Sequence, residues 1–218
     1  MGDLSTYSLT DFIPLTPEVY FRLFVRLNDY AWPAHILAVA LGFGALWALS
    51  RGRGRLFSAA LAACWIWVGY AFHLSLYAEL NWAATYFGWA FIIQGGLLLS
   101  SGFTGRFDPP GGAPTKGPGR YGLAVALLAL VAFPIVGIVD GQNWRGIQVF
   151  GVAPDPTALF TLGALLIAER TPWHLLAIPI LWAVVTGATA WTLGAPGGIT
   201  TAGVTVVSLG VAIWKVFR

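Results

Sequence analysis

Three ionisable side chains, His35, His73 and Asp155, lie in otherwise apolar stretches of the sequence. Ionisable groups are costly inside a membrane, so each is a functional candidate by default. Neutral imidazoles and a carboxylate are ordinary ligands of a divalent transition metal, and the same set suits a proton relay. We therefore predict that the three converge on one pocket open to the outside, which binds a solute, an ion or a divalent metal. The alternative is that each histidine only anchors its helix near the membrane interface.

Composition makes lipid the bulk solvent of this chain. Of its 218 residues, 57% are hydrophobic and 10% are charged, whereas about a quarter of ordinary residues are charged. The single cysteine, Cys64, excludes an internal disulfide and any cysteine-based metal or iron–sulfur motif. The net charge is only +3, and the basic residues lie at the ends of apolar runs, so nucleic acid is not an expected partner. The expected partners are the lipid bilayer, a small solute or ion, and other membrane proteins or further copies of the chain.

The apolar stretches predict an all-α fold, a polytopic membrane helix bundle of about seven transmembrane helices. A helix needs about 20 apolar residues to cross the hydrocarbon layer. Six stretches satisfy this directly or nearly so, at residues 31–50, 56–78, 82–100, 121–139, 173–193 and 200–217. A seventh apolar stretch, 148–168, contains the interruption Pro154-Asp155-Pro156.

The basic residues predict the orientation, because Lys and Arg near helix ends stay on the cytoplasmic side. In a seven-helix threading, nine of the 12 fall on one side, namely Arg51, Arg53, Arg55, Arg106, Lys116, Arg120, Arg170, Lys215 and Arg218. With six helices the alternation of sides breaks after the fourth helix. We therefore expect the amino terminus outside and the carboxyl terminus inside, in the cytoplasmic (inner) membrane.

Acidic residues gather on the expected outer side. The same threading places Glu79 and Asp140 there, and we predict that both contribute to the outward-facing substrate site. An acidic mouth raises the local concentration of cations and repels anions. The alternative is that the acids are merely tolerated outside during membrane insertion.

The chain is expected to have four parts. They are an N-terminal interfacial segment (1–30), a three-helix half (31–101), a cytoplasmic linker rich in Gly and Pro (102–120) and a four-helix half (121–218). In the first part, Thr16 and Pro17 mark a helix start. Apolar and charged residues then fall on opposite faces, which predicts an amphipathic helix in the outer interface. A simple extension of the first membrane helix is the alternative.

The interrupted stretch predicts a fifth helix that is too short to cross the membrane. A helix from Pro156 to Glu169 would have Asp155 as its N-cap and would rise only about 20 Å. Residues 148–154 would then enter the membrane as non-helical chain, which is tolerated only when it is buried in protein or lines a wet cavity. Interrupted helices of this type are typical of transporter sites.

Several familiar chemistries lack their residues. Lys215 lies at the cytoplasmic end of the last apolar stretch, so retinal attachment at mid-membrane is not expected. The sequence has no Gly-Lys phosphate loop, no His-Glu-x-x-His pair and no nucleophile elbow. ATP-driven transport and common intramembrane hydrolysis are therefore not expected.

Three segments carry a resemblance to a known family. They are residues 11–33 (DFIPLTPEVYFRLFVRLNDYAWP), 150–163 (FGVAPDPTALFTLG) and 179–194 (PILWAVVTGATAWTLG). The chain resembles an uncharacterised family of bacterial multi-pass membrane proteins, sometimes labelled a permease. The resemblance implies a membrane fold and an important broken segment, but no mechanism. It also implies cysteine in many members at the position of Asp155, where this chain departs from the pattern.

The leading functional hypothesis is a permease or channel for a small solute or cation. One rival is a subunit of a membrane electron-transfer or photosynthetic complex, in which His35 and His73 ligate haem or pigment, or the helices only pack against a partner. A second rival is a membrane enzyme that acts on a lipid or quinone. The sequence leaves open whether the protein is an enzyme, although it favours a non-enzymatic role.

Overall fold

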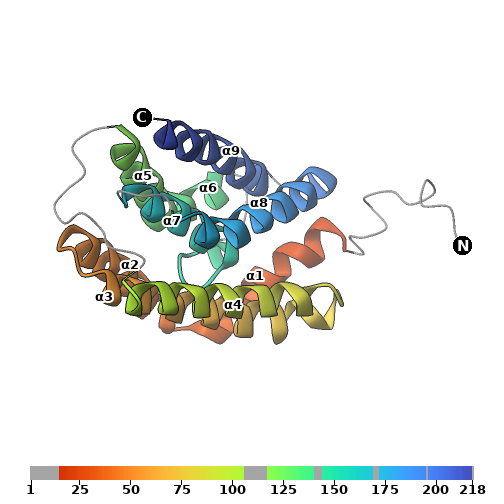
Figure 1. The fold of residues 1–218 in the computed structure, drawn as a ribbon. Coiled ribbons are helices and arrows are strands. Elements are labelled where there is room, and N and C mark those ends of the chain that lie inside the picture. Colours follow the sequence, from red (N-terminus) through yellow and green to blue (C-terminus); the bar gives the residue numbers. More distant parts are fainter. Residues whose placement is uncertain (1–14, 106–116, 140–143, 169–171, 195, 218) are drawn as a thin grey trace, which may run out of the picture.

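The chain forms a bundle of α-helices. The structure, a computed structural model, describes residues 15–105, 117–139, 144–168, 172–194 and 196–217 (Figure 1). Within these ranges the chain has no strand, so the predicted all-α class is confirmed. The α-helices are α1 (Pro17–Ala31), α2 (Ala34–Ser50), α3 (Gly54–Val68), α4 (Ala84–Phe103), α5 (Gly117–Leu127), α6 (Phe133–Val139), α7 (Pro154–Ile167), α8 (Trp173–Leu193) and α9 (Pro196–Val216).

Shorter helical turns join some of these helices. A π-helical turn, η3 (Gly69–Leu74), continues α3, and the 3-10 turn η4 (Tyr77–Glu79) follows it. A second π-helical turn, η5 (Leu128–Ala132), links α5 to α6, and the 3-10 turn η6 (Trp144–Gly146) precedes the segment that leads to α7.

Among the described residues, four helical stretches are long and apolar enough to cross a membrane. They are Gly54–Glu79, Ala84–Phe103, Gly117–Ile135 and Trp173–Leu193. If α1 and α2 are counted together as one bent span, the number of such stretches rises to five. Helix α7 and the stretch Ile199–Lys215 are shorter apolar helices. The helical architecture is therefore compatible with a membrane protein, whereas seven crossings and their orientation stay predictions.

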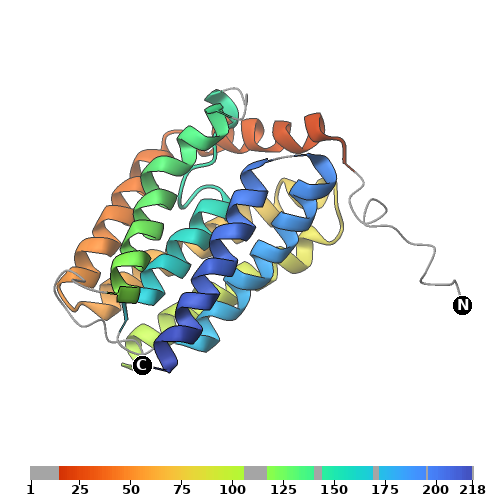
Figure 2. The ribbon, with the colours of Figure 1, turned by 90° about the horizontal axis from the view of Figure 1, so that it is seen from above.

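Helix α1 lies across one end of the bundle. The axes of α1 and α2 are bent by 90° at the break between the two helices (Figure 2). Thr16 caps the first turn of α1 by accepting the backbone N–H of Val19. The apolar face of α1, which includes Leu23, Phe24 and Leu27, is buried against the bundle. The predicted amphipathic helix is therefore present, and its apolar face packs on protein.

Helix α7 forms the centre of the bundle. All of its 14 residues are buried, and it packs against α3, α5, α8 and α9 (Figure 1). A helix of this length rises about 21 Å, which is less than the hydrocarbon thickness of about 30 Å. Because most of its residues are apolar and all of them are buried, it is stable only when other helices surround it.

Two glycines bring α5 and α7 into backbone contact. A Cβ atom on Gly122 would lie 2.4 Å from the carbonyl oxygen of Gly163, and one on Gly163 would lie 2.5 Å from the carbonyl oxygen of Gly122. Neither backbone can move aside as a flexible side chain would. Small residues at helix contacts are the usual route to close packing in membrane bundles, and this pair fixes the position of α7.

Candidate functional site

The start of α7 lies inside the protein. The preceding non-helical residues 148–153 are all buried. The Thr157 hydroxyl accepts the backbone N–H of Gly151 at 2.9 Å and donates to the carbonyl oxygen of Ala153 at 2.7 Å. These bonds satisfy backbone groups that a buried helix start would otherwise leave without partners.

Asp155 does not cap α7, so the predicted N-cap is wrong. The helix begins at Pro154, and its N-cap is Ala153, whose side chain makes no capping bond. Thr157 instead binds the chain before the helix, which leaves the Asp155 side chain available to a neighbouring helix. A carboxylate in the first turn still interacts favourably with the positive end of the helix dipole.

The Asp155 carboxylate is held by α8. Trp182 Nε1 donates to Asp155 Oδ1 at 2.8 Å, and Thr186 Oγ1 donates to Oδ2 at 3.1 Å. Trp182 and Thr186 are four residues apart, so both face α7 from adjacent turns. Asp155 is 1% exposed. Within the described part of the chain, both of its partners are neutral donors and no cation pairs with it.

Helix α1 reaches the same place through Tyr20. The Tyr20 side chain is buried, and it lies near Thr186 and the Asp155 carboxylate. The carboxylate therefore lies where α1, α7 and α8 meet.

His73 lies on the other side of Trp182. The two rings are 4.9 Å apart, centroid to centroid, at an interplanar angle of 78°. Phe91 is also close, with its ring centroid 4.5 Å from that of His73. His73 is 0% exposed, and neither of its ring nitrogens has a hydrogen-bond partner. It belongs to the π-helical turn η3, and such turns are frequent at functional sites.

His35 is held elsewhere. Its Nε2 atom lies 3.0 Å from Asn28 Oδ1, and the Asn28 amide nitrogen donates to the backbone carbonyls of Arg145 and Ile147. This arrangement ties the first turn of α2 to α1 and to the segment before α7. His35 therefore acts as part of a structural joint between these elements.

The structure does not form the predicted three-residue metal site. Among the residues it describes, no three His, Cys, Asp or Glu side chains gather closely enough to hold a metal. His73 and Asp155 are brought together by their common neighbour Trp182, whereas His35 binds Asn28. The physical reason is that His35 is engaged by α1, which turns across the end of the bundle.

The two other predicted site residues are Glu79 and Asp140. Glu79 forms an ion pair with Arg26 at 3.2 Å, and both side chains are about half exposed, at 55% and 53%. This pair links α1 to the end of the α3 stretch, and exposed pairs of this kind contribute about 1 kcal/mol or less. Asp140 lies outside the described residues.

Sequence reasoning missed the partners of Asp155. In the sequence, the only signal from Trp182 and Thr186 is that they lie four residues apart in an apolar helix. Tyr20 is recognisable only as a residue of the apolar face of α1. We refer to Asp155, Trp182, Thr186, Tyr20 and His73 as the Asp155 cluster.

The fold and the site define the protein as an apolar, all-α bundle with a short buried helix and a carboxylate at the start of that helix. Residues 17–218 match DUF6064, a family of unknown function, and the chain belongs to this family. The predicted membership of an uncharacterised family is thus confirmed. No curated protein and no solved structure matches the chain.

The geometry predicts that Trp182→Phe destabilises the protein. Phenylalanine keeps most of the ring contact with His73 but leaves Asp155 Oδ1 without its donor, and losing one partner of a buried charged group costs about 1–3 kcal/mol. We expect a clear fall in the thermal unfolding temperature of the protein purified in detergent. The matched control is Trp191→Phe, because Trp191 is 77% exposed. Equal unfolding temperatures for the two variants would contradict the assigned role of Trp182.

Proposed function

We propose that this protein is a multi-pass membrane permease or channel for a small cation, with Asp155 as its intramembrane charge. The observation that carries the proposal is the environment of that carboxylate, which is buried and is bound by two neutral donors from α8. Burying a charge is costly unless it is paired. A group kept in this state, in a helix surrounded by protein, is suited to binding a cation that passes through.

The interrupted segment supports the same reading. Transporter sites are typically formed where a helix starts or stops within the membrane, because such ends present polar groups at that depth. Here the half-length helix α7 starts after buried non-helical chain and places Asp155 in its first turn. The His73 ring, with both nitrogens lacking partners, lies beside the same tryptophan that binds Asp155. We propose that these two groups take up and release the transported cation or a coupled proton.

The proposed topology has seven membrane helices. They are α2, the α3 stretch Gly54–Glu79, α4, the α5 stretch Gly117–Ile135, α7, α8 and α9, with α1 in the outer interface. Arg51 lies between α2 and α3, and Lys215, near the end of α9, donates to the carbonyl oxygens of Leu166 and Ala168 at the end of α7. These basic residues would mark the inner side. The exposed rings of Trp32 and Trp82 would mark the outer side.

Labelling of introduced cysteines tests this orientation. In a Cys64→Ala background, we expect Trp82→Cys to react with a membrane-impermeant maleimide on intact cells, because Trp82 is 73% exposed at the proposed outer end. We expect Arg51→Cys to react only after the membrane is permeabilised. The background variant without an introduced cysteine measures unspecific labelling. The reverse pattern would show that the proposed orientation is wrong.

Cation flux into vesicles tests the function itself. Protein reconstituted into liposomes should carry K⁺ or H⁺, detected with an enclosed ion-sensitive or pH-sensitive dye. We expect Asp155→Asn to lower this flux by about tenfold or more, because the intramembrane charge is lost, while the introduced amide can still accept from Trp182. The matched control is Glu79→Gln, which removes a half-exposed carboxylate that pairs with Arg26 rather than with a member of the Asp155 cluster.

The flux proposal has two contradicting outcomes. One is that the wild-type protein carries neither cation above the level of protein-free liposomes. The other is that Asp155→Asn and Glu79→Gln carry cations at the wild-type rate. Equal thermal unfolding temperatures for the three proteins would ensure that any difference in flux does not reflect misfolding.

A further inference from the structure

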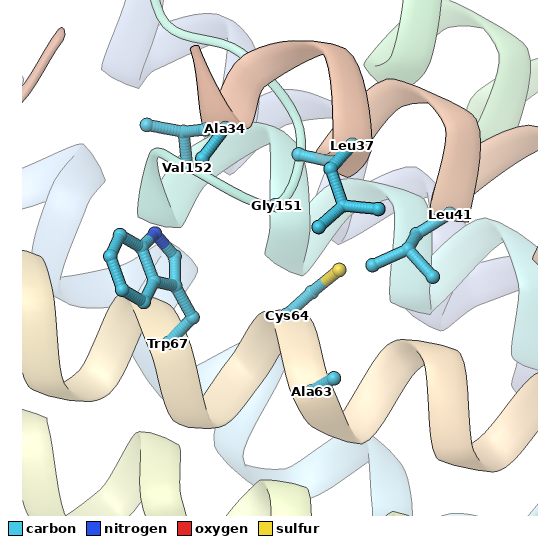
Figure 3. A pocket seen from close by; sticks show the side chains of 9 residues that line it. Ala34, Leu37, Leu41, Ala63, Cys64, Trp67, Gly151 and Val152 are labelled. Carbon is cyan, nitrogen blue, oxygen red and sulfur yellow. The ribbon is translucent and has the colours of Figure 1, made fainter. Parts of the chain in front are cut away.

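A pocket lies between α2, α3 and the segment that leads into α7. Its volume is about 240 Å³. Leu37, Ala38 and Leu41 of α2 form one wall, Cys64 and Trp67 of α3 form the opposite wall, and Gly151 closes the end (Figure 3). Figure 3 shows the leucine side chains and the Cys64 sulfur directed into the space between the two helices. No member of the Asp155 cluster lines it, so the pocket is separate from the proposed cation site.

The chemistry of the walls selects an apolar occupant. Apart from the Cys64 thiol and the edge of Trp67, the lining side chains are hydrocarbon. A water molecule needs two or more polar partners to occupy a cavity, and an engineered apolar cavity of about 150 Å³ stays dry and binds benzene. The present pocket is larger, so it has room for a short length of hydrocarbon chain.

The surroundings of the pocket indicate where such a chain comes from. Leu37 is 62% exposed and Ala63, at the mouth, is also exposed. The neighbouring Ile36 is 66% exposed. An exposed surface made of such side chains is suited to lipid tails. The pocket therefore opens toward the hydrocarbon layer in the topology proposed above.

Aromatic rings mark the end of the pocket nearest the proposed outer interface. Tyr30 and Trp67 stack with ring centroids 6.2 Å apart and planes 7° from parallel. Tyr and Trp concentrate at the level of the lipid headgroups. The pocket, which extends from Trp67 along α2 to Leu41, therefore lies at the depth of lipid tails.

We propose that this pocket binds one acyl chain of a membrane phospholipid. The occupant would touch Gly151, where φ is +73° and a Cβ atom would lie 3.0 Å from Ala38 Cβ and 3.1 Å from Cys64 Sγ. The backbone N–H of Gly151 is bound by Thr157, so the bound chain would press on the segment that positions α7. The proposal depends on the membrane location but not on cation transport.

Photolabelling tests the pocket directly. The protein is reconstituted into liposomes that contain a phosphatidylcholine with a diazirine in one acyl chain, and adducts are mapped by mass spectrometry after illumination. Bulk lipid labels exposed side chains such as Ile36. Only a chain inside the pocket reaches Cys64, which is 3% exposed, and a carbene inserts readily into its S–H bond. We expect an adduct on Cys64 as well as on the exposed surface.

A variant at the mouth provides the matched comparison. Ala63→Phe changes an exposed residue and should leave the fold intact, yet it takes the space that the chain needs. We expect the Cys64 adduct to fall about tenfold or more, because a filled site excludes the chain, while labelling of Ile36 is unchanged. Leu56→Phe is the control, because Leu56 is exposed on the same helix and does not line the pocket.

The outcomes separate the two proposals. Labelling of exposed residues without Cys64, or equal Cys64 labelling in Ala63→Phe and Leu56→Phe, would overturn the acyl-chain site and leave the membrane location standing. Absence of acyl-chain labelling on any residue would overturn the site together with the membrane location. Displacement of the Cys64 adduct by an added isoprenoid quinone, but not by unlabelled phosphatidylcholine, would overturn the assignment to a phospholipid.

Discussion

The structure depends on keeping a half-length helix inside the protein, where neighbouring elements bind polar groups at both of its ends. A buried helix leaves up to four N–H groups and four carbonyl groups without intrahelical partners at its two ends. In α7, neighbouring elements supply hydrogen-bond partners to polar groups at the two ends of the helix. Thr157 organises the entering chain, Asp155 is bound from α8, and Lys215 from α9 binds the carbonyl oxygens at the far end.

The remaining helices are arranged around this requirement. Gly122 lets α5 approach the backbone of α7. On α3, Trp65 donates its indole N–H to Thr161 at 2.8 Å. Helix α1, although it lies across the end of the bundle, sends Tyr20 toward Thr186. The neighbours therefore contribute close packing or polar contacts around α7, and the Asp155 carboxylate lies where three elements converge.

The fold class and the short helix could be predicted from sequence because both depend on local properties. Long apolar runs with few charges indicate membrane-compatible helices, and Pro154-Asp155-Pro156 indicates a helix start inside an apolar stretch. The predicted start was two residues too late, because the helix begins at Pro154 and its N-cap is Ala153 rather than Asp155. Thr157 binds Gly151 and Asp155 binds α8, and both contacts depend on where those segments lie in the fold.

The composition of the site could be predicted only in part. Counting residues along helices gives depth, but it does not give direction around the helix axis. The π-helical turn η3 changes the direction in which the side chains after α3 point. As a result, the His73 side chain lies among aromatic rings. His35 was expected to share that space because of its similar depth, whereas Asn28 binds it at the junction of α1 and α2. Both outcomes result from tertiary contacts that no single segment encodes.

Direct binding between Asp155 and Trp182 should stabilise the bundle. A double-mutant cycle measures this interaction, with unfolding free energies determined for the wild type, Asp155→Ala, Trp182→Phe and the double variant. We expect a coupling free energy of about 1 kcal/mol or more, because the two residues are in direct contact through a charged hydrogen bond. A coupling within about 0.3 kcal/mol of zero, with both single variants folded, would contradict this expectation.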